Sequence, residues 1–324
     1  MKSFLKLIPF FLFFIFLFSC RAKTNNPKIA IAQYIDHPML DECRKGFMDK
    51  MDELGYKQDV NVSFDYLNAQ GDMNVNKSIA DKFGKGKYDI IFSIATPITQ
   101  ALKKTTELSK TPVVFGAITD PVSAGLVNSI TSSGNNFTGT SDKWPYYDQL
   151  NLIKKIIPKA INIGVVYNSG ESNTEFAISE TKKAANKLNL NIIESPITNT
   201  NEVALGTKNL IGKVDAVYIT ADNTTMASAP VIIKIATENN IPVFAGDLGT
   251  FESGCIAGIG VSYYNLGVSN AIMVDKILKK KINPSDIPIV ISENPELMVN
   301  LKIARALNIT IPDSIINNAV VIAK

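Results

Sequence analysis

Hydrophobic positions along the chain switch repeatedly between two spacings. Residues 28–34 form an apolar, β-rich run, and residues 43–56 carry apolar side chains near helical spacing that end beside a Gly. The first pattern predicts a buried strand and the second an amphipathic helix. Further apolar runs at residues 88–94 and 111–121 flank a helical pattern at residues 96–110. This regular alternation predicts an α/β architecture with parallel sheets.

One stretch of this pattern occurs twice. Residues 86–97 read GKYDIIFSIATP and residues 212–223 read GKVDAVYITADN, so each begins Gly-Lys-x-Asp, continues as an apolar run and ends in a polar segment that contains Thr. The alternation of strands and helices also restarts at Asn162, as it first starts at Lys28. We therefore expect two Rossmann-like lobes of similar build.

The order of the segments indicates how the chain divides between the two lobes. Three segments are candidates to cross from one lobe to the other: residues 135–145, 256–267 and 289–300. A hinge of several strands lets two lobes close on a ligand without drifting apart. The expected division is 1–19 for an export signal, 20–27 for a lipidated Cys and tether, 28–140 with about 263–290 for the N-terminal lobe, and 141–262 with about 291–324 for the C-terminal lobe.

Polar residues follow several of the predicted strands. In open parallel sheets, ligands bind beyond the carboxyl ends of the strands, so two facing lobes would enclose a ligand between these polar segments. Trp144 and Tyr263 adjoin candidate crossing segments, where packing at the hinge is favoured over stacking on a ligand. The candidate ligand-binding positions at strand ends are Thr96, Thr119, Asp120, Ser169, Ser172, Asn173, Thr174, Asp222, Asn223 and Asp247.

The segment YNSGESNT at residues 167–174 is the best local candidate for a ligand site. Its hydroxyl and amide side chains precede a predicted helix, whose free backbone N–H groups can hold a carboxylate. Simple capping of that helix is the alternative. Asp222 and Asn223 are candidates to accept hydrogen bonds from an ammonium group, or else to form a turn or cap. Asp120 precedes Pro121, which alone indicates a turn.

Several reaction classes lack the residues that they need. His37 is the only histidine, and we expect it to pack or form a hydrogen bond rather than to catalyse. Glu171 and Glu175 lie at helical spacing, which favours a solvated helix face. Cys43 and Cys255 are too far apart for a metal knuckle and are expected to be buried, small apolar residues. We therefore predict no metal, no cofactor and no catalytic residue.

The N-terminus has the features of an export signal. Lys2 and Lys6 precede twelve apolar residues, too few to span a bilayer, and the segment LFSC ends at Cys20. This ending resembles the lipobox of bacterial lipoproteins, in which the Cys is acylated; the alternative is a plain signal peptide. Once Lys2 and Lys6 are removed the chain is nearly neutral, and no basic patch indicates binding to nucleic acid.

The chain resembles the substrate-binding lipoproteins of ABC importers for tryptophan, tyrosine or phenylalanine, a family with the type I periplasmic-binding fold. The resemblance runs from about Lys28 to the C-terminus. It rests on an ordered series of motifs: HPMLD (37–41), AQGD (69–72), IATP (94–97), TDPVSAGLV (119–127), NNFTGTSD (135–142), YNSGESNT (167–174), TADN (220–223), PVFAGD (242–247), YYNLG (263–267) and NLKIARALN (300–308).

The resemblance implies roles for residues in these loops. It implies that residues 169–174 capture the carboxylate of a ligand and that the ammonium group lies near Asp222. The residues implied to lie opposite are Thr96, Asp120, Ser141 and Asp142.

These observations predict an extracytoplasmic, lipid-anchored, monomeric solute-binding protein without enzymatic activity. It would close two lobes on a free amino acid with an aromatic or large apolar side chain, and present it to an ABC permease from the cell surface or the periplasm. Burial of such a zwitterion requires partners for both of its charges. Two alternatives are a sensory receptor subunit that binds without transport and a secreted hydrolase on the same scaffold, which would need an acid and a base in the cleft.

Overall fold

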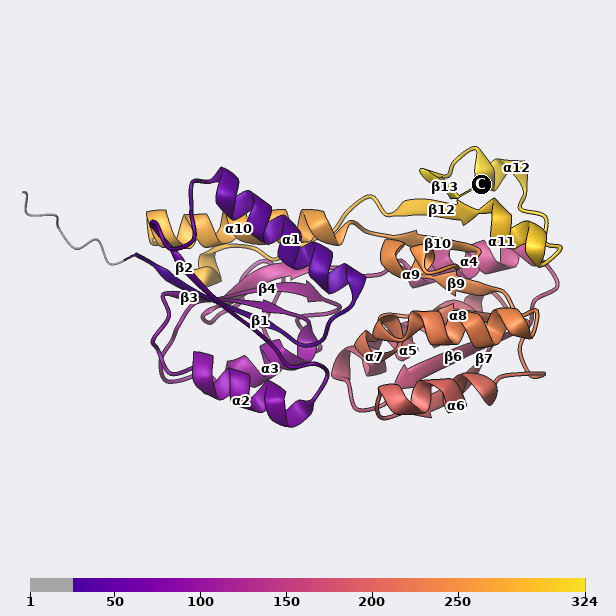
Figure 1. Cartoon of the computed structure of the whole chain (residues 1–324), viewed down its shortest axis with the longest axis horizontal. Coiled ribbons are helices and arrows are strands. Elements are labelled where there is room, and N and C mark those ends of the chain that lie inside the picture. The colour runs from indigo at the N-terminus through magenta and orange to yellow at the C-terminus, as the bar shows by residue number, and fades with distance from the viewer. Residues whose placement is uncertain (1–25, 324) are drawn as a thin grey trace, which may run out of the picture.

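The computed structural model describes residues 26–323 and consists of two α/β lobes that lie side by side along the long axis of the molecule (Figure 1). Each lobe is built on one mainly parallel sheet covered by helices. The C-terminus lies in the second lobe, at the end far from the first strand (Figure 1). The predicted fold class, two lobes with parallel sheets, is therefore confirmed.

The N-terminal lobe contains a six-stranded sheet. Its elements are β1 (Lys28–Gln33), α1 (Pro38–Glu53), β2 (Ser63–Asn68), α2 (Met73–Phe83), β3 (Ile90–Ile94), α3 (Thr96–Thr105), β4 (Val113–Ile118), β5 (Phe137–Ser141), α10 (Tyr263–Lys280), η2 (Pro284–Asp286) and β11 (Val290–Ile291). The strand order is β11-β5-β4-β3-β1-β2. The helices α1 and α10 lie side by side on one face of the sheet, and α2 and α3 cover the other face (Figure 1).

The C-terminal lobe contains a seven-stranded sheet in the order β13-β12-β10-β9-β8-β6-β7. Among the described strands of this sheet, only β10 and β12 pair in antiparallel fashion. The elements are α4 (Tyr146–Ile156), β6 (Asn162–Asn168), α5 (Ser172–Lys187), β7 (Asn191–Ile197), η1 (Thr200–Glu202), α6 (Val203–Lys208), β8 (Ala216–Ile219), α7 (Asn223–Ala227), α8 (Ala229–Glu238), β9 (Val243–Ala245), α9 (Leu248–Glu252), β10 (Ala257–Gly260), β12 (Glu296–Asn300), α11 (Leu301–Ala306), α12 (Asp313–Ile316) and β13 (Val321–Ala323).

The repeated Gly-Lys-x-Asp phrase has the same role in both lobes. Asp89 accepts a hydrogen bond from the backbone N–H of Lys28 at 2.8 Å, and Asp215 accepts one from the N–H of Asn162, also at 2.8 Å. In each lobe the Asp thus holds the start of the first strand beside the strand that follows the phrase. The Gly that opens each phrase has a left-handed φ, 73° and 74°, which favours Gly. The repetition therefore serves the fold.

The chain passes between the lobes three times. β5 leads into α4, β10 into α10, and β11 into β12. The connecting residues are 142–145, 261–262 and 292–295, and each set lies within one of the segments predicted to cross. Three connections permit the lobes to rotate toward each other while they prevent the lobes from drifting apart.

The facing edges of the two lobes are in contact. Ser172 Oγ in α5 donates a hydrogen bond to Gln100 Oε1 in α3 at 3.0 Å. Gly249 in α9 lies against Pro38 and Met39 at the start of α1, where a Cβ on Gly249 would come within 2.6 Å of Met39 Cε. Because both contacts join one lobe to the other, the protein is in a closed arrangement.

The expected export signal and the lipid anchor at Cys20 lie outside the described residues. Within residues 26–323, none of the helices combines the length and the apolar character that crossing a bilayer requires. Cys43 and Cys255 are free and fully buried, as predicted for small apolar residues.

Candidate functional site

A small cavity lies between the two lobes. Its volume is about 10 Å³, room for about one water molecule. Strand ends and helix starts of both lobes form its wall, as expected for the carboxyl edges of parallel sheets. The lining residues are His37, Leu40, Thr96, Ala117, Thr119, Asp142 and Tyr263 on the N-terminal side, and Asn173, Ala221, Asp222, Asn223 and Met226 in the C-terminal lobe.

Two alanines with unusual backbone conformations shape the N-terminal side of this cavity. Ala95, with φ 85°, immediately precedes α3, and Ala117, with φ 57°, lies where the pairing of β4 with β5 shifts in register. Left-handed φ values are costly for residues with a Cβ and are concentrated at functional sites. As a result, α3 begins with Thr96 at the cavity, and Thr119 follows β4 into it.

Asp142 connects the cavity to the hinge. It lies in the first crossing and is 3% exposed. Its Oδ2 accepts a hydrogen bond from the hydroxyl of Tyr263 at the second crossing, and this hydroxyl accepts one from Trp144 Nε1 at 3.2 Å. Asp142 Oδ1 is buried and has no hydrogen-bond partner within residues 26–323. Asp142 therefore presents one unused acceptor at the cavity.

Asp222 ties three segments of the C-terminal lobe together. Its Oδ1 accepts a hydrogen bond from the backbone N–H of Thr225 at 2.7 Å and so caps α7. Its Oδ2 accepts hydrogen bonds from the N–H of Asn168 at 2.6 Å and from the Thr174 hydroxyl at 2.9 Å. Both oxygens are therefore engaged by protein donors, although Asp222 also lines the cavity.

Glu171 is buried beside Asp222 instead of lying on a solvated helix face. It is 3% exposed, and its carboxylate accepts hydrogen bonds from Asn223 Nδ2 at 2.6 Å and from the Thr224 hydroxyl at 2.8 Å. The predicted solvated face is thus wrong for Glu171, because this residue precedes α5 and turns inward to the polar start of α7. Glu175, within α5, is exposed.

Four buried carboxylates gather at the facing edges of the lobes without a cation. Burial raises the pKa of Asp142 and of Asp247 to about 6. Burial, and then the charge of Asp222, raise the pKa of Glu171 to about 7, and burial also raises the pKa of Asp222. None of the ion pairs within residues 26–323 involves these groups. Because buried carboxylates are costly unless paired, the site has capacity for a positive charge.

Two further side chains of the cavity carry unpaired polar atoms. Both ring nitrogens of His37 and the Oδ1 of Asn173 are buried without a hydrogen-bond partner in the described part of the chain. Burial lowers the pKa of His37 to about 4, an effect that neighbouring Asn223 only partly opposes, so the ring is neutral at neutral pH. Buried polar groups are normally hydrogen-bonded, so these atoms have unused capacity for a hydrogen bond.

The structure brings part of the predicted site together. The predicted residues that line the cavity are Thr96, Thr119, Asp142, Asn173, Asp222 and Asn223. The predicted residues outside its lining are Asp120, Ser141, Ser169, Ser172, Thr174 and Asp247.

Each of the residues outside the lining makes at least one hydrogen bond to another protein group, although Asp247 Oδ2 is buried without a partner within residues 26–323. Asp120 and Asp247 each accept a backbone N–H bond from the residue three positions further on, as caps and turns require. Short polar side chains at such turns bond to nearby backbone and side chains in preference to a ligand. The hydroxyls of Ser141, Ser169, Ser172 and Thr174 donate to Thr119, Ile197, Gln100 and Asp222 respectively.

The cavity also contains residues that the sequence does not identify as ligand contacts. His37 lies in the loop after the first strand, just as the predicted polar residues lie after other strands. This position in the sequence could have identified it as a candidate. For Tyr263 the sequence favours packing at the hinge over contact with a ligand, but this residue lines the cavity as well. The apolar members resemble core residues in the sequence, so no local signal sets them apart: Leu40, Ala117, Ala221 and Met226.

Comparison with known proteins shows the family of the chain. Residues 28–322 match the family model described as ABC transporter substrate binding protein. The chain belongs to this family. The family that the sequence resembles is thereby confirmed, and so is the predicted role as the substrate-binding component that works with an ABC transporter.

This substrate-binding protein has relatives with named ligands. It is 37% identical to the Tyrosine-binding protein of Clostridioides difficile (strain R20291) over 289 residues, which cover 88% of this chain and 83% of the relative. An ABC domain from Streptococcus pneumoniae, solved in complex with L-Trp, is 33% identical and has a TM-score of 0.88, with 92% of this chain and 99% of that chain covered.

Another solved structure is described as open. It is the ligand-free, open structure of a substrate-binding protein with adhesive properties from Clostridium difficile, 38% identical with the same coverage, but its TM-score is only 0.67. The coverage equals that of the L-Trp complex and the identity is higher, so the lower score is consistent with the description of this relative as open. This substrate-binding protein is therefore similar to the ligand-bound relative in its closed arrangement.

Proposed function

We propose that this protein captures a free amino acid with an aromatic side chain between its lobes and delivers it to an ABC permease. The observation that carries this proposal is the cavity between the lobes, where buried carboxylates have no cation and Asp142 Oδ1 has no partner. A free amino acid supplies the missing positive charge on its ammonium group. It brings a carboxylate at the same time, which also needs a partner when buried.

The ammonium group of the ligand fits best at Asp142. The unpaired oxygen acceptors in the described lining of the cavity are Asp142 Oδ1 and Asn173 Oδ1, whereas both oxygens of Asp222 already accept hydrogen bonds. A hydrogen bond between an ammonium group and a carboxylate is among the stronger polar contacts in proteins. We therefore assign the ammonium to Asp142 and Asn173, and we assign Asp222 to holding the loops in place.

The carboxylate of the ligand fits at the start of α3. The residue before this helix, Ala95, has no side chain that could cap the first turn, and Thr96 lines the cavity. Free N–H groups in the first turn of a helix attract anions. The start of α5 also lacks a side-chain cap and reaches the cavity through Asn173, so the segment predicted for carboxylate capture contributes at that residue.

The named relatives support an aromatic side chain on the ligand. One is called a tyrosine-binding protein, and the other is solved with L-Trp. Leu40 and Met226 supply apolar lining, and the flexible Met side chain adapts to rings of different shape. A cavity of about 10 Å³ is smaller than any aromatic amino acid. The lobes must therefore open to admit the ligand, and these side chains must move as the lobes close on it.

We also propose that Cys20 is acylated after the export signal is removed, which would hold the protein at an extracytoplasmic membrane surface. We propose that the anchored protein is a monomer. The first strand begins at Lys28, so only a short polar tether separates Cys20 from the N-terminal lobe. Binding and release require no covalent change in the ligand, and we assign no catalytic role to any residue of the cavity.

A thermal-shift screen of the purified protein against the twenty amino acids and common nucleosides tests the proposed function. We expect one or more of tryptophan, tyrosine and phenylalanine to raise the melting temperature selectively, because a ligand that binds only the folded protein stabilises it. A rise with nucleosides alone, or conversion of the ligand into a product, would contradict the proposal.

A further inference from the structure

His37 is the least satisfied side chain of the cavity. It is 4% exposed and lines the cavity, and neither of its ring nitrogens has a hydrogen-bond partner within residues 26–323. A histidine that served only the fold would normally have at least one nitrogen hydrogen-bonded. The side chain of Asn223 lies close enough to the ring to offset part of the effect of burial on its pKa, but neither ring nitrogen accepts or donates a hydrogen bond within residues 26–323, so both remain available to a ligand.

The protonation state of His37 limits what that group can be. Because burial lowers its pKa to about 4, the ring is neutral at neutral pH and offers one N–H donor and one nitrogen acceptor. A neutral ring is a poorer partner for a buried charge than Asp142 is for an ammonium group. The ammonium end of an amino acid is thus better held at Asp142, and its carboxylate is assigned to the start of α3, so His37 is left to contact an uncharged polar group.

The apolar surroundings of His37 point to the same end of the ligand. Leu40 lies one turn further along α1 and lines the cavity beside it, and Met226 in α7 lines the cavity from the other lobe. Both are almost fully buried. These side chains suit an aromatic ring, so His37 is placed among the residues that would surround the side chain of the ligand.

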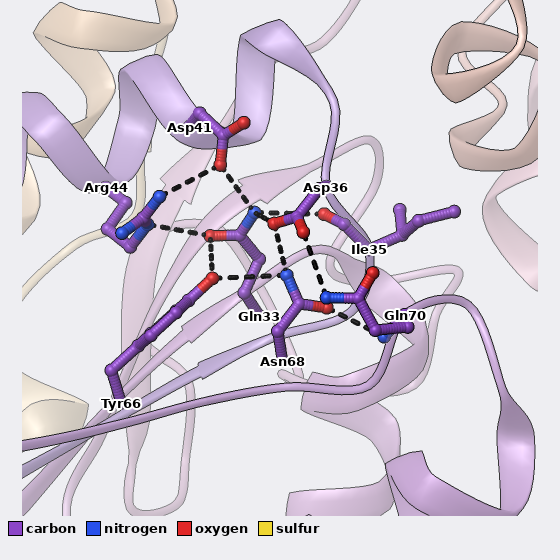
Figure 2. A network of polar contacts seen from close by, with 8 residues as sticks. All are labelled: Gln33, Ile35, Asp36, Asp41, Arg44, Tyr66, Asn68 and Gln70. Carbon is purple, nitrogen blue, oxygen red and sulfur yellow. Dashed lines mark hydrogen bonds and ion pairs between the residues drawn. The ribbon is translucent and has the colours of Figure 1, made fainter.

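A network of polar contacts fixes the residues just before His37 (Figure 2). Gln33 is fully buried at the end of β1, and its Nε2 donates to the backbone oxygen of Ile35 at 2.9 Å and to Asp41 at 2.9 Å. Asp36 accepts hydrogen bonds from Gln70 Nε2 at 2.9 Å and from Asn68 Nδ2. The loop that carries His37 is thereby bonded to β1, to the end of β2 and to α1.

The other side of Gln33 anchors the network to α1. Arg44 Nε donates to Gln33 Oε1 at 3.1 Å, and Arg44 also contacts Asp41 at 3.1 Å. The Arg44 guanidinium lies 4.5 Å from the centre of the Tyr66 ring. With Asp36 held on one side and Pro38 opening α1 on the other, His37 has little freedom to move. A binding residue that is held in this way loses little entropy when its ligand arrives.

We propose that His37 determines which aromatic amino acid is bound, by hydrogen-bonding a polar atom on the ring of the ligand, such as a phenol hydroxyl or an indole N–H. This inference rests on the proposed function, and it goes further in naming the residue that selects the side chain. A site built to hydrogen-bond a ring substituent rejects the analogue that lacks it, because the buried partner is then left unpaired. The protein is thus a poor receptor for phenylalanine.

Pairs of ligands that differ by one polar atom test the role of His37. The pairs are L-tyrosine with L-phenylalanine, and L-tryptophan with 3-(3-benzothienyl)-L-alanine, in which sulfur replaces the indole N–H. Titration calorimetry on the purified wild type, His37→Phe and His37→Gln gives the affinity ratio within each pair. Tyr264→Phe is the matched control, since it removes one polar atom from an aromatic side chain on the surface, where the hydroxyl donates to Asp49 at 3.1 Å.

For the pair that contains the better ligand, we expect His37→Phe to reduce the affinity ratio by about tenfold, the worth of one buried hydrogen bond. His37→Gln, which keeps a donor and an acceptor, is expected to retain part of the ratio, and Tyr264→Phe all of it. Equal weakening of both members of that pair, or no change in the ratio, would overturn the inference while leaving the proposed function standing. If the wild type bound no member of either pair, the inference about His37 and the proposed function would both be contradicted.

Discussion

At the residue scale, Asp142 combines two tasks in one carboxyl group. One oxygen accepts a hydrogen bond from the hydroxyl of Tyr263, and this bond joins two of the crossings between the lobes. The other oxygen lies at the cavity without a hydrogen-bond partner within residues 26–323. A ligand ammonium bound to the second oxygen would therefore contact a residue that is itself part of the hinge. No other residue in the described lining of the cavity belongs to the first crossing.

The pKa of Asp142 gives a testable pH dependence. Burial raises this pKa to about 6, although the Tyr263 hydroxyl partly opposes the effect. As the pH falls from 8 to 5, the carboxyl group of the ligand-free protein takes up a proton and can no longer pair with an ammonium ion. We expect the affinity for the amino acid to fall over this range, and Asp142→Asn to weaken binding at pH 8 by about tenfold to a hundredfold.

Titration calorimetry between pH 5 and pH 8 measures this dependence. Because Glu171 also has a raised pKa, of about 7, some pH dependence should remain in Asp142→Asn, but it should be smaller than in the wild type. An identical pH profile in the variant and the wild type would show that Asp142 does not hold the ammonium group.

At the element scale, Asp222 joins the end of β6 to the starts of α5 and α7. Its three protein donors are all buried. Asp222→Ala leaves those donors without a partner, so we expect the free energy of unfolding of the ligand-free protein to fall by about 1–3 kcal/mol. Urea denaturation measures the change.

Asp120 provides a matched control for this substitution. It also accepts a backbone N–H from the residue three positions ahead, but it is only half-buried, so Asp120→Ala should cost less than Asp222→Ala. If Asp222→Ala kept the stability of the wild type and lost only ligand binding, the ammonium role predicted from the sequence would be restored to Asp222.

The elements themselves could be predicted from the sequence, for a physical reason. Strands buried on both faces, such as β3 and β4, are continuous apolar runs, and helices such as α3 show one apolar face, so both patterns are local. The Gly-Lys-x-Asp repeat is local as well, and it marks equivalent strand starts in the two lobes.

The site could be predicted from the local pattern mainly where a strand end leads into it directly. Thr96, Thr119 and Asp222 satisfy that condition and line the cavity. Ser169 lies in such a loop too, but its hydroxyl bonds to the backbone of Ile197, and the local pattern does not reveal which way a short polar side chain turns. The inward turn of Glu171 depends on α7, which is more than fifty residues away in the chain.

At the scale of the whole molecule, the two lobes close around an excess of negative charge. Ser172 with Gln100, and Gly249 with the start of α1, hold the facing edges together. In this closed arrangement the carboxylates at the facing edges are buried, and no lysine or arginine within residues 26–323 pairs with them. Buried negative charges without a cation are costly, so we expect a ligand that brings an ammonium ion between the lobes to shift the equilibrium toward the closed arrangement.

The most direct test of this charge requirement is titration calorimetry with ligands that differ only in the ammonium group. L-Tryptophan is compared with indole-3-propionate, and L-tyrosine with 3-(4-hydroxyphenyl)propionate, on the wild-type protein at pH 8. We expect loss of the ammonium group to weaken binding of the preferred ligand by about a hundredfold. Equal affinity for the amino acid and its deaminated analogue would contradict capture of the ammonium ion by the buried acids between the lobes.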